Sequence, residues 1–269
     1  MDTETRTVEA NGLAFGCVEA GDGDRLALCL HGFPDDAGSM EPLQSRLVDA
    51  GYTTVAPYMR GYAPTEPAPD GGYSARALGA DAVALAETYV EREGLEGAVL
   101  VGHDWGAVAG YAAAVQSPGT FDRMATLAIP PRFDALLARH PRQVARSWYM
   151  WFFQLQGMAE RALRWQDFAL IEFLWGIWSP SWDYPGERIE SVKATFSEGE
   201  TVENALAYYR QFVGPAARQV ARSGRLPSLA DRRRIEVPTV VLAGTEDGAI
   251  GPGLFERADE AFDARCRVV

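Results

Sequence analysis

Apolar and polar positions follow two different periods along most of the chain, which predicts strands interleaved with helices. Residues 5–19 alternate around Asn11-Gly12, which predicts a β-hairpin. The alternation of short apolar runs with longer amphipathic stretches predicts an α/β fold, with a mostly parallel sheet and helices on both faces. The expected strands are residues 26–30, 52–57, 98–101, 121–130, 237–243 and 266–269, and the expected helices are residues 40–50, 74–93, 107–116 and 253–262.

The pattern changes between Pro131 and about Leu226, where strand signals vanish and aromatic-rich helical segments replace them. We expect a core built from residues 1–130 and 231–269, with a helical lid over residues 131–230. Ligands bind at the carboxyl ends of strands in open α/β sheets, so an insertion between two strands is placed to cover that edge. Most aromatic residues of the insertion are expected to form its own core. Six of the seven tryptophans lie here: Trp148, Trp151, Trp165, Trp175, Trp178 and Trp182.

One short stretch, residues 97–106 with the sequence GAVLVGHDWG, carries the strongest chemical signal. An apolar run that predicts a buried strand is followed by a turn with flanking glycines and then by a helical run. This is the context of a nucleophile elbow, with Asp104 at the position that is most often serine. An Asp that merely caps the helix would not require both glycines and the strand. A carboxylate can attack an sp3 carbon directly, displacing a halide or opening an epoxide.

Composition excludes several other classes of function. With 47% hydrophobic residues in 269, the chain can bury the core of one large domain or two small ones, and its net charge of −12 argues against nucleic acid and anionic membrane surfaces. Three cysteines without metal-ligand spacing predict reduced thiols, a cytoplasmic location and neither metal nor cofactor. Residues 1–5 lack an apolar signal core. The most apolar segment, residues 168–178, is too short to span a bilayer.

The chain resembles the epoxide hydrolase branch of the α/β-hydrolase family. Two aromatic stretches of the lid, WYMWFFQ at residues 148–154 and AYYR at residues 207–210, add to the resemblance, which covers nearly the whole chain in the family's order. The resemblance implies an aspartate nucleophile, two lid tyrosines and an acid–histidine pair that activates water. Four core motifs carry it: HGFP at residues 31–34, RGY at 60–62, GHDWG at 102–106 and GTEDG at 244–248.

The resemblance assigns the polar roles to particular residues. Asp104 is the implied nucleophile, and the hydroxyls of Tyr149 and Tyr209 would stabilise the oxygen of the opening epoxide. Tyr208 is the neighbour of Tyr209, and on a helix the two side chains point about 100° apart, so the motif favours Tyr209. Asp247 would orient the catalytic histidine.

The resemblance also predicts the surroundings of the reacting atoms. The backbone N–H groups of Phe33 and Trp105 would form an oxyanion hole for the ester on Asp104. The side chains of Phe33, Trp105, Trp151 and Phe153 are expected to bind a small apolar, epoxide-type substrate. Glu246 is the adjacent alternative to Asp247 as the acid, although a solvated loop charge is the expected state of Glu246.

The histidine of the implied mechanism has no match among the three in the chain. His31 belongs to the oxyanion loop, His103 flanks the nucleophile and is expected to point away from the crevice, and His140 begins the lid. In the family, the base lies in the loop after the last strand, and the sequence ends within the stretch that predicts this strand. The resemblance therefore implies a natural chain that continues through this loop, and a 269-residue chain that completes only the alkylation half of the reaction. The alternative is a protein that lacks the base.

Two other functions remain open. A haloalkane dehalogenase shares the Asp nucleophile and the adjacent tryptophan, but it often carries an Asn after His-Gly, where this chain has Phe33, and the tyrosine pair favours the epoxide. A catalytically inert ligand-binding protein on the same fold would use the aromatic lid to hold an apolar molecule. Homodimerisation is a further possibility at this stage.

Overall fold

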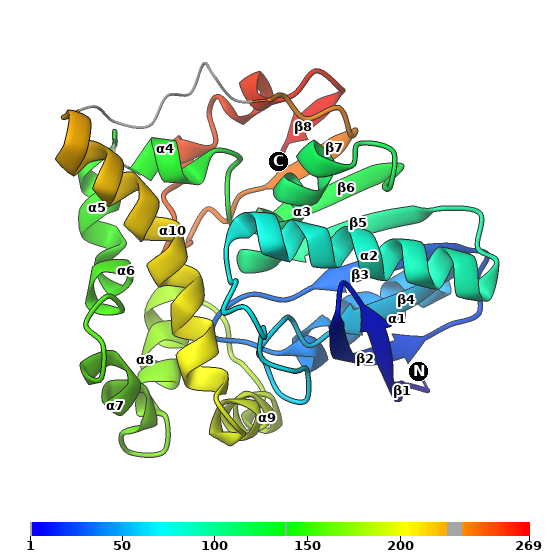
Figure 1. The fold of residues 1–269 in the computed structure, drawn as a ribbon, viewed down its shortest axis with the longest axis horizontal. Coiled ribbons are helices and arrows are strands. Elements are labelled where there is room, and N and C mark those ends of the chain that lie inside the picture. Colours follow the sequence, from blue (N-terminus) through cyan, green and yellow to red (C-terminus); the bar gives the residue numbers. More distant parts are fainter. Residues whose placement is uncertain (1, 138, 225–232) are drawn as a thin grey trace.

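The computed structural model describes residues 2–137, 139–224 and 233–269, which form one eight-stranded sheet with the order β1-β2-β4-β3-β5-β6-β7-β8 (Figure 1). The pairs β1–β2 and β2–β4 are antiparallel, and all later pairs are parallel. The sheet therefore has the mostly parallel character that the sequence predicts. The strands are β1 (Glu4–Ala10), β2 (Leu13–Ala20), β3 (Arg25–Leu30), β4 (Tyr52–Pro57), β5 (Ala98–His103), β6 (Arg123–Leu127), β7 (Thr239–Leu242) and β8 (Cys266–Val268).

Local sequence signals explain where several of these elements begin and end. The β1–β2 hairpin turns at Asn11 and Gly12, whose φ values of 48° and 74° suit a two-residue hairpin turn. Helix α2 (Ala75–Glu93) begins after Ser74, whose side chain accepts a hydrogen bond from the Ala77 N–H, and it ends at Gly94 in the left-handed region. The hairpin and the helix are both confirmed.

Helices cover both faces of the sheet. Helices α2 and α3 (Trp105–Gln116) pack on one face, and α1 (Glu41–Asp49) packs against β4 on the other (Figure 1). Strands β3 and β5 lie at the centre and are almost entirely buried, which accounts for their continuous apolar sequences. In β7 the two faces differ, because Val241 is fully buried whereas Val240 is 37% exposed.

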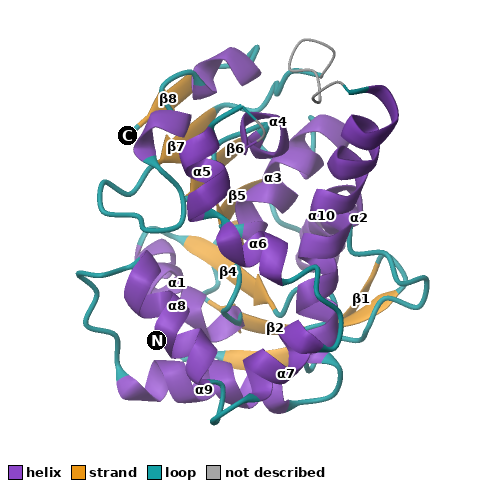
Figure 2. Ribbon diagram, turned by 90° about the vertical axis from the view of Figure 1, so that its left-hand side faces the viewer, coloured by secondary structure: helices purple, strands orange, loops and turns teal. Residues whose placement is uncertain are grey.

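All the remaining helices lie between β6 and β7, on one side of the sheet at the carboxyl ends of its parallel strands (Figure 2). The loop after β3 ties them to the core, because the fully buried Asp36 forms an ion pair with Arg188 at 2.5 Å and accepts a hydrogen bond from the Thr195 hydroxyl. None of the described helices is long and apolar enough to cross a membrane. These helices are α4 (Phe133–Leu137), α5 (Pro141–Arg146), α6 (Trp148–Phe152), α7 (Met158–Arg164), α8 (Ala169–Trp178), α9 (Gly186–Ser197) and α10 (Thr201–Ser223).

The prediction of a helix over residues 253–262 is wrong. The segment instead forms two short 3₁₀ turns, Pro252–Leu254 and Ala258–Ala261. Its backbone is needed elsewhere, because the Ala261 carbonyl accepts a hydrogen bond from the Ile235 N–H, and Ile235 forms an isolated bridge with Phe262. Arg257 (φ −123°, ψ 27°) and Phe262 (φ −115°, ψ 144°) both lie outside the α-helical region, so no continuous helix runs through the segment.

The two faces of β7 predict different costs for the same substitution. Val241→Thr places a hydroxyl at a fully buried position and should lower the free energy of unfolding by about 1–3 kcal/mol. Val240→Thr is the matched control and should change it by less than about 0.5 kcal/mol, because the side chain is partly exposed. Urea unfolding followed by circular dichroism measures both. Equal destabilisation by the two substitutions would contradict the observed orientation of the strand.

Candidate active site

The turn from β5 into α3 requires glycine at two positions. A Cβ atom on Gly102 would collide with the carbonyl of Gly106, and one on Gly106 would collide with the carbonyl oxygen of Leu30. Because strand and helix approach so closely, Asp104 adopts φ 51° and ψ −112°, a sparsely populated conformation for a residue with a side chain. The elbow geometry predicted from the glycine spacing is present around Asp104.

The carboxylate of Asp104 is buried beside the loop that follows β3. The backbone N–H of Phe33 donates a hydrogen bond of 2.9 Å to Asp104 Oδ1. Burial raises the pKa of Asp104, and the nearby His103 together with the backbone N–H groups of Phe33 and Trp105 counteracts this increase. The negative charge of Asp247 raises the pKa further. Two backbone N–H groups are therefore directed at the same carboxyl group.

A cavity of about 530 Å³ lies above Asp104. It forms where β3, β5, β6 and β7 end, so loops that are distant in the sequence meet there. The segment between β6 and β7 supplies mainly aromatic side chains to the cavity, and the loops that follow the strands supply its carboxyl groups. The lining includes Phe33, Asp35, His103, Asp104, Ile129 and Asp247 from the core, and Tyr149, Trp175, Trp178 and Trp182 from the segment between β6 and β7.

Asp247 lies in the loop after β7 and lines the same cavity as Asp104. Its Oδ1 accepts hydrogen bonds from the backbone N–H groups of Ala249 (2.7 Å) and Ile250 (2.9 Å), and burial raises its pKa. Glu246 also lines the cavity but is exposed, whereas Asp247 is partly buried. Gln143 of α5 holds the loop by donating to the Ala249 carbonyl and accepting from the backbone N–H of residue 251.

Tyr149 on α6 and Tyr209 on α10 are brought together although 60 residues separate them. Both are buried, and their ring centroids lie 5.9 Å apart. Burial, followed by the charge of Asp104, raises the pKa of each phenol well above its usual value, so both hydroxyls remain protonated. Both tyrosines therefore lie within the electrostatic influence of the carboxylate.

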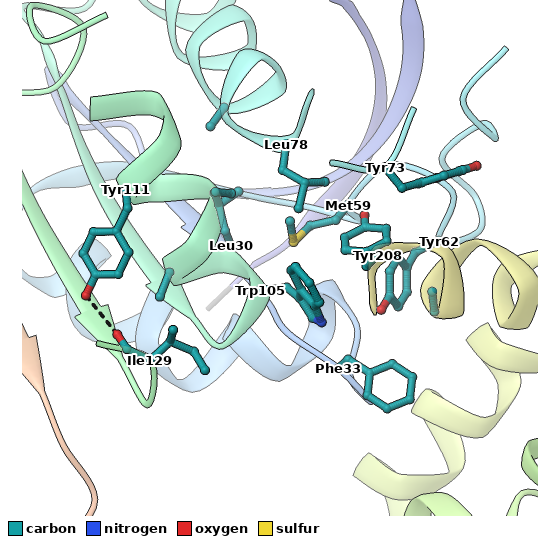
Figure 3. Packing of buried hydrophobic residues seen from close by; sticks show 14 of the residues in the cluster. Leu30, Phe33, Met59, Tyr62, Tyr73, Leu78, Trp105, Tyr111, Ile129 and Tyr208 are labelled. Carbon is teal, nitrogen blue, oxygen red and sulfur yellow. Dashed lines mark hydrogen bonds between the residues drawn. The ribbon is translucent and has the colours of Figure 1, made fainter. Parts of the chain in front are cut away.

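Tyr208 occupies a different environment from Tyr209. Its hydroxyl donates a hydrogen bond of 2.8 Å to the Arg60 carbonyl, and its ring packs edge-on against Tyr62 and Trp105 (Figure 3). Because the Tyr208 hydroxyl is already bonded to a backbone carbonyl, its role is structural. The preference for Tyr209 over Tyr208, drawn from the motif, agrees with this arrangement.

The four expected substrate-binding side chains are placed differently from one another. Phe33 lines the cavity, and Trp105 packs behind it against Tyr209 with ring centroids 5.0 Å apart. Phe153 is fully buried against Phe33 and forms part of the wall behind the lining. Trp151 is 41% exposed, and its indole N–H donates to the Val144 carbonyl, so the structure does not bring it to the cavity.

The three histidines differ in their access to the cavity. His31 is fully buried, accepts a hydrogen bond from the Met59 N–H at Nε2 and contacts the Gly32 carbonyl through Nδ1, while burial lowers its pKa to about 4. It is therefore neutral and engaged at both nitrogens. The expectation that His103 points away from the crevice is wrong, because His103 is the last residue of β5 and lines the cavity beside Asp104. His140 contacts the Leu136 carbonyl at the start of α5.

Asp35 is a lining residue that the sequence analysis missed. It accepts hydrogen bonds from the Asp36 N–H and the Ser39 hydroxyl, and burial raises its pKa to about 6. Its position directly after the HGFP motif, where β3 ends, could have indicated that Asp35 lies at the cavity. No group of acidic, histidine or cysteine side chains suited to a metal ion occurs among the described residues.

Comparison with known proteins identifies the family. The family model described as the alpha/beta hydrolase fold matches residues 28–269. The chain belongs to this family. The match confirms the predicted α/β-hydrolase fold, and the mostly parallel sheet and its flanking helices agree with it.

Several relatives of this α/β hydrolase extend over most of its length. It is 28% identical to the AB hydrolase superfamily protein YfhM of Bacillus subtilis over 89% of this chain and 80% of that protein. It is 29% identical to epoxide hydrolase 3 of Mus musculus over 95% of this chain and 66% of the mouse protein, so it spans about two thirds of that relative. The crystal structure of epoxide hydrolase A from Mycobacterium thermoresistibile is 27% identical, with a TM-score of 0.79 over 100% of this chain and 90% of that one.

The raised pKa of Asp35 predicts how the stability of this hydrolase depends on pH. The folded protein holds the Asp35 proton up to about pH 6, whereas the unfolded chain releases it near 3.8. The stabilisation from this group is therefore complete below about pH 4 and is lost as the pH rises through about 6. Asp35→Asn keeps the acceptor oxygen without titrating, so its stability relative to the wild type should increase from pH 4 to pH 7. Urea unfolding at both pH values tests this, and a pH-independent difference would contradict it.

Proposed function

We propose that this α/β hydrolase opens epoxides to vicinal diols through a covalent ester on Asp104. The observation that carries the proposal is the placement of two buried, protonated tyrosines near a buried carboxylate at an aromatic-lined cavity. The relatives named as epoxide hydrolases support the same conclusion.

In the first half-reaction, an Asp104 carboxylate oxygen attacks an epoxide carbon. The new carbon–oxygen bond forms as the epoxide carbon–oxygen bond breaks, and the electron pair moves onto the former ring oxygen. This alkoxide needs a proton donor, and the phenols of Tyr149 and Tyr209 are the candidates because burial keeps both protonated.

In the second half-reaction, water attacks the carbonyl carbon of the ester. The negative charge develops on the carbonyl oxygen, and the N–H groups of Phe33 and Trp105 stabilise it; the Phe33 N–H already donates to Asp104 Oδ1. Collapse of the intermediate breaks the ester bond, and the leaving oxygen takes up the proton that the base removed from water, which releases the diol. The remaining carboxyl proton returns to the phenolate formed in the first half-reaction, which restores the carboxylate. A histidine whose charged form is stabilised by Asp247 would take the proton from water.

We further propose that residues 131–230 form a lid over a core made of residues 1–130 and 231–269. Tyr149, Trp175 and Trp178 line the cavity from the lid side, and the indole N–H of Trp175 donates to the Pro34 carbonyl of the core. The lid would exclude water from the reacting carbons and provide the phenol donors. The residues of the lid that lie between 225 and 230 are outside the described residues.

The 269-residue chain should form the Asp104 ester more rapidly than it hydrolyses it, because no histidine is hydrogen-bonded to Asp247 among the described residues. Incubation with styrene oxide followed by intact-protein mass spectrometry should show one added substrate mass. Asp104→Asn is the control and should add none. Peptide mapping should place the mass on Asp104.

Other outcomes of the same experiment decide between the alternatives. Steady diol release by this chain would show that a resident base acts, and loss of the release in His103→Gln would identify His103, which lines the cavity. A folded chain that neither forms the ester nor releases diol would contradict the proposal and favour an inert binding protein.

The tyrosine pair predicts a second, independent result. Tyr149→Phe and Tyr209→Phe should each slow formation of the ester by about 10²-fold or more, because each removes a proton donor for the alkoxide. Tyr208→Phe is the matched control, since its hydroxyl donates to the Arg60 carbonyl, and it should leave the rate within about threefold. Stopped-flow tryptophan fluorescence measures these rates. Equal rates for Tyr209→Phe and Tyr208→Phe would remove the assigned role.

Haloalkane dehalogenation is a second candidate that one observation favours. The indole N–H of Trp105 is buried and forms no well-aligned hydrogen bond among the described residues; it lies beside the Tyr209 hydroxyl, whose pKa it lowers. An unpartnered donor adjacent to the nucleophile suits a leaving halide. Chloride release from 1-chlorohexane, absent in Asp104→Asn and faster than the reaction with epoxides, would favour this candidate.

A further inference from the structure

The outer edge of the lid carries an unusual set of exposed side chains. Helices α5, α6 and α7 stack along the left edge of Figure 1, which faces the viewer in Figure 2. We define the basic aromatic face as the exposed residues of this stack. Its apolar members are Trp148 (39% exposed), Trp151 (41%), Leu155 (48%), Met158 (57%) and Trp165 (65%), and its basic members are Arg142, Arg146, Arg161 and Arg164.

Charge on this face is strongly one-sided. All of residues 141–166 are described, and no exposed carboxylate occurs among them; the acids that border them, Asp167 and Glu203, are paired with Lys193 and Arg164 respectively. Glu160, the only acid in this range, is half-buried and paired with Arg210 at 2.8 Å. Arg164 pairs with Glu203, whereas Arg142 and Arg161 form no ion pair with any described residue. The face is thus positive in a chain whose net charge is −12.

The spacing of these residues places both kinds of side chain on one surface. Met158 and Arg161 are three residues apart on α7, which puts them on the same side of the helix, and Trp165 directly follows the end of α7. Large exposed apolar side chains gathered in this way cost free energy in water and mark an interaction site. Tryptophan with arginine is the composition found where proteins meet the headgroup region of a bilayer.

We propose that the basic aromatic face docks the protein peripherally on anionic phospholipid surfaces. The arginines would pair with lipid phosphates, and Trp165, Met158 and their neighbours would insert at the level of the headgroups. Tryptophan suits this depth because its ring is apolar and its indole N–H can still meet water or phosphate. The proposal does not depend on the chemistry at Asp104.

The net charge of −12 suggested that anionic membranes would be avoided, but net charge is an average over the whole chain. At physiological ionic strength the screening length is about 8 Å, so only charges close to the lipid contribute much to the interaction. Repulsion of acidic side chains elsewhere on the molecule would then favour an approach through the basic aromatic face.

Sedimentation with lipid vesicles tests the proposal on the 269-residue chain. We expect binding to vesicles of equal parts phosphatidylcholine and phosphatidylglycerol, little binding to phosphatidylcholine alone, and release in high salt. The double substitution Arg142→Glu, Arg161→Glu should weaken binding by at least about 30-fold, because each surface cation contributes about a fivefold increase in affinity. Met158→Ser, Trp165→Ser should weaken it by about tenfold or more.

Arg123→Glu, Arg267→Glu is the matched control, because it makes the same change of charge at exposed arginines of β6 and β8, outside the lid. It should leave binding within about twofold. Equal losses in both arginine pairs would show that only total charge matters and would overturn the proposal. Failure of the folded wild-type chain to bind anionic vesicles would also overturn it. A dimer in light scattering that the Met158/Trp165 variant abolishes, without vesicle binding, would reassign the face to self-association.

Discussion

The close approach of Gly106 to the carbonyl of Leu30 is the constraint on which the rest of the site depends. It lets α3 begin directly after β5 and forces Asp104 into a conformation that costs about 1–3 kcal/mol. The surrounding sheet stabilises this turn, because β5 is paired on both sides by buried strands. The carboxylate is consequently held against the Phe33 N–H before any ligand arrives.

A second constraint is the set of buried polar contacts that fix the helices between β6 and β7 to the sheet and its loops. The Asp36–Arg188 ion pair is buried on the core side, so removing one partner would leave a charge uncompensated in a dry environment. Gln143 connects α5 by hydrogen bonds to the loop after β7 that contains Asp247, and the Trp175 indole connects α8 to the loop after β3. These contacts join the helices between β6 and β7 to the loops after β3 and β7, which also line the cavity at Asp104. The position of these helices and the shape of the cavity are therefore determined together.

Burial raises the pKa of both kinds of acid around this cavity, but the consequence differs for phenols and for a carboxyl group. It raises the pKa of the phenols of Tyr149 and Tyr209, which keeps them as proton donors. It also raises the pKa of Asp104, which alone would favour a neutral carboxyl group, but His103 and the two backbone N–H groups oppose that effect. The same low-polarity surroundings can therefore hold donors and a carboxylate side by side, provided that N–H groups converge on the carboxylate.

The sequence by itself determined the sheet and its order of elements, the elbow at Asp104 and the helical insertion, because strand and helix periods and glycine spacing are local properties. It did not determine which of several neighbouring polar or aromatic side chains meets the cavity. The bond of the Tyr208 hydroxyl to the Arg60 carbonyl, the inward position of His103 and the outward position of Trp151 were decided by packing against segments distant in the sequence. Residues 253–262 form two short 3₁₀ turns instead of the predicted helix, and Phe262 at their end pairs with Ile235. A local pattern fixes the direction of a side chain relative to its own element, and only the tertiary structure fixes what lies in that direction.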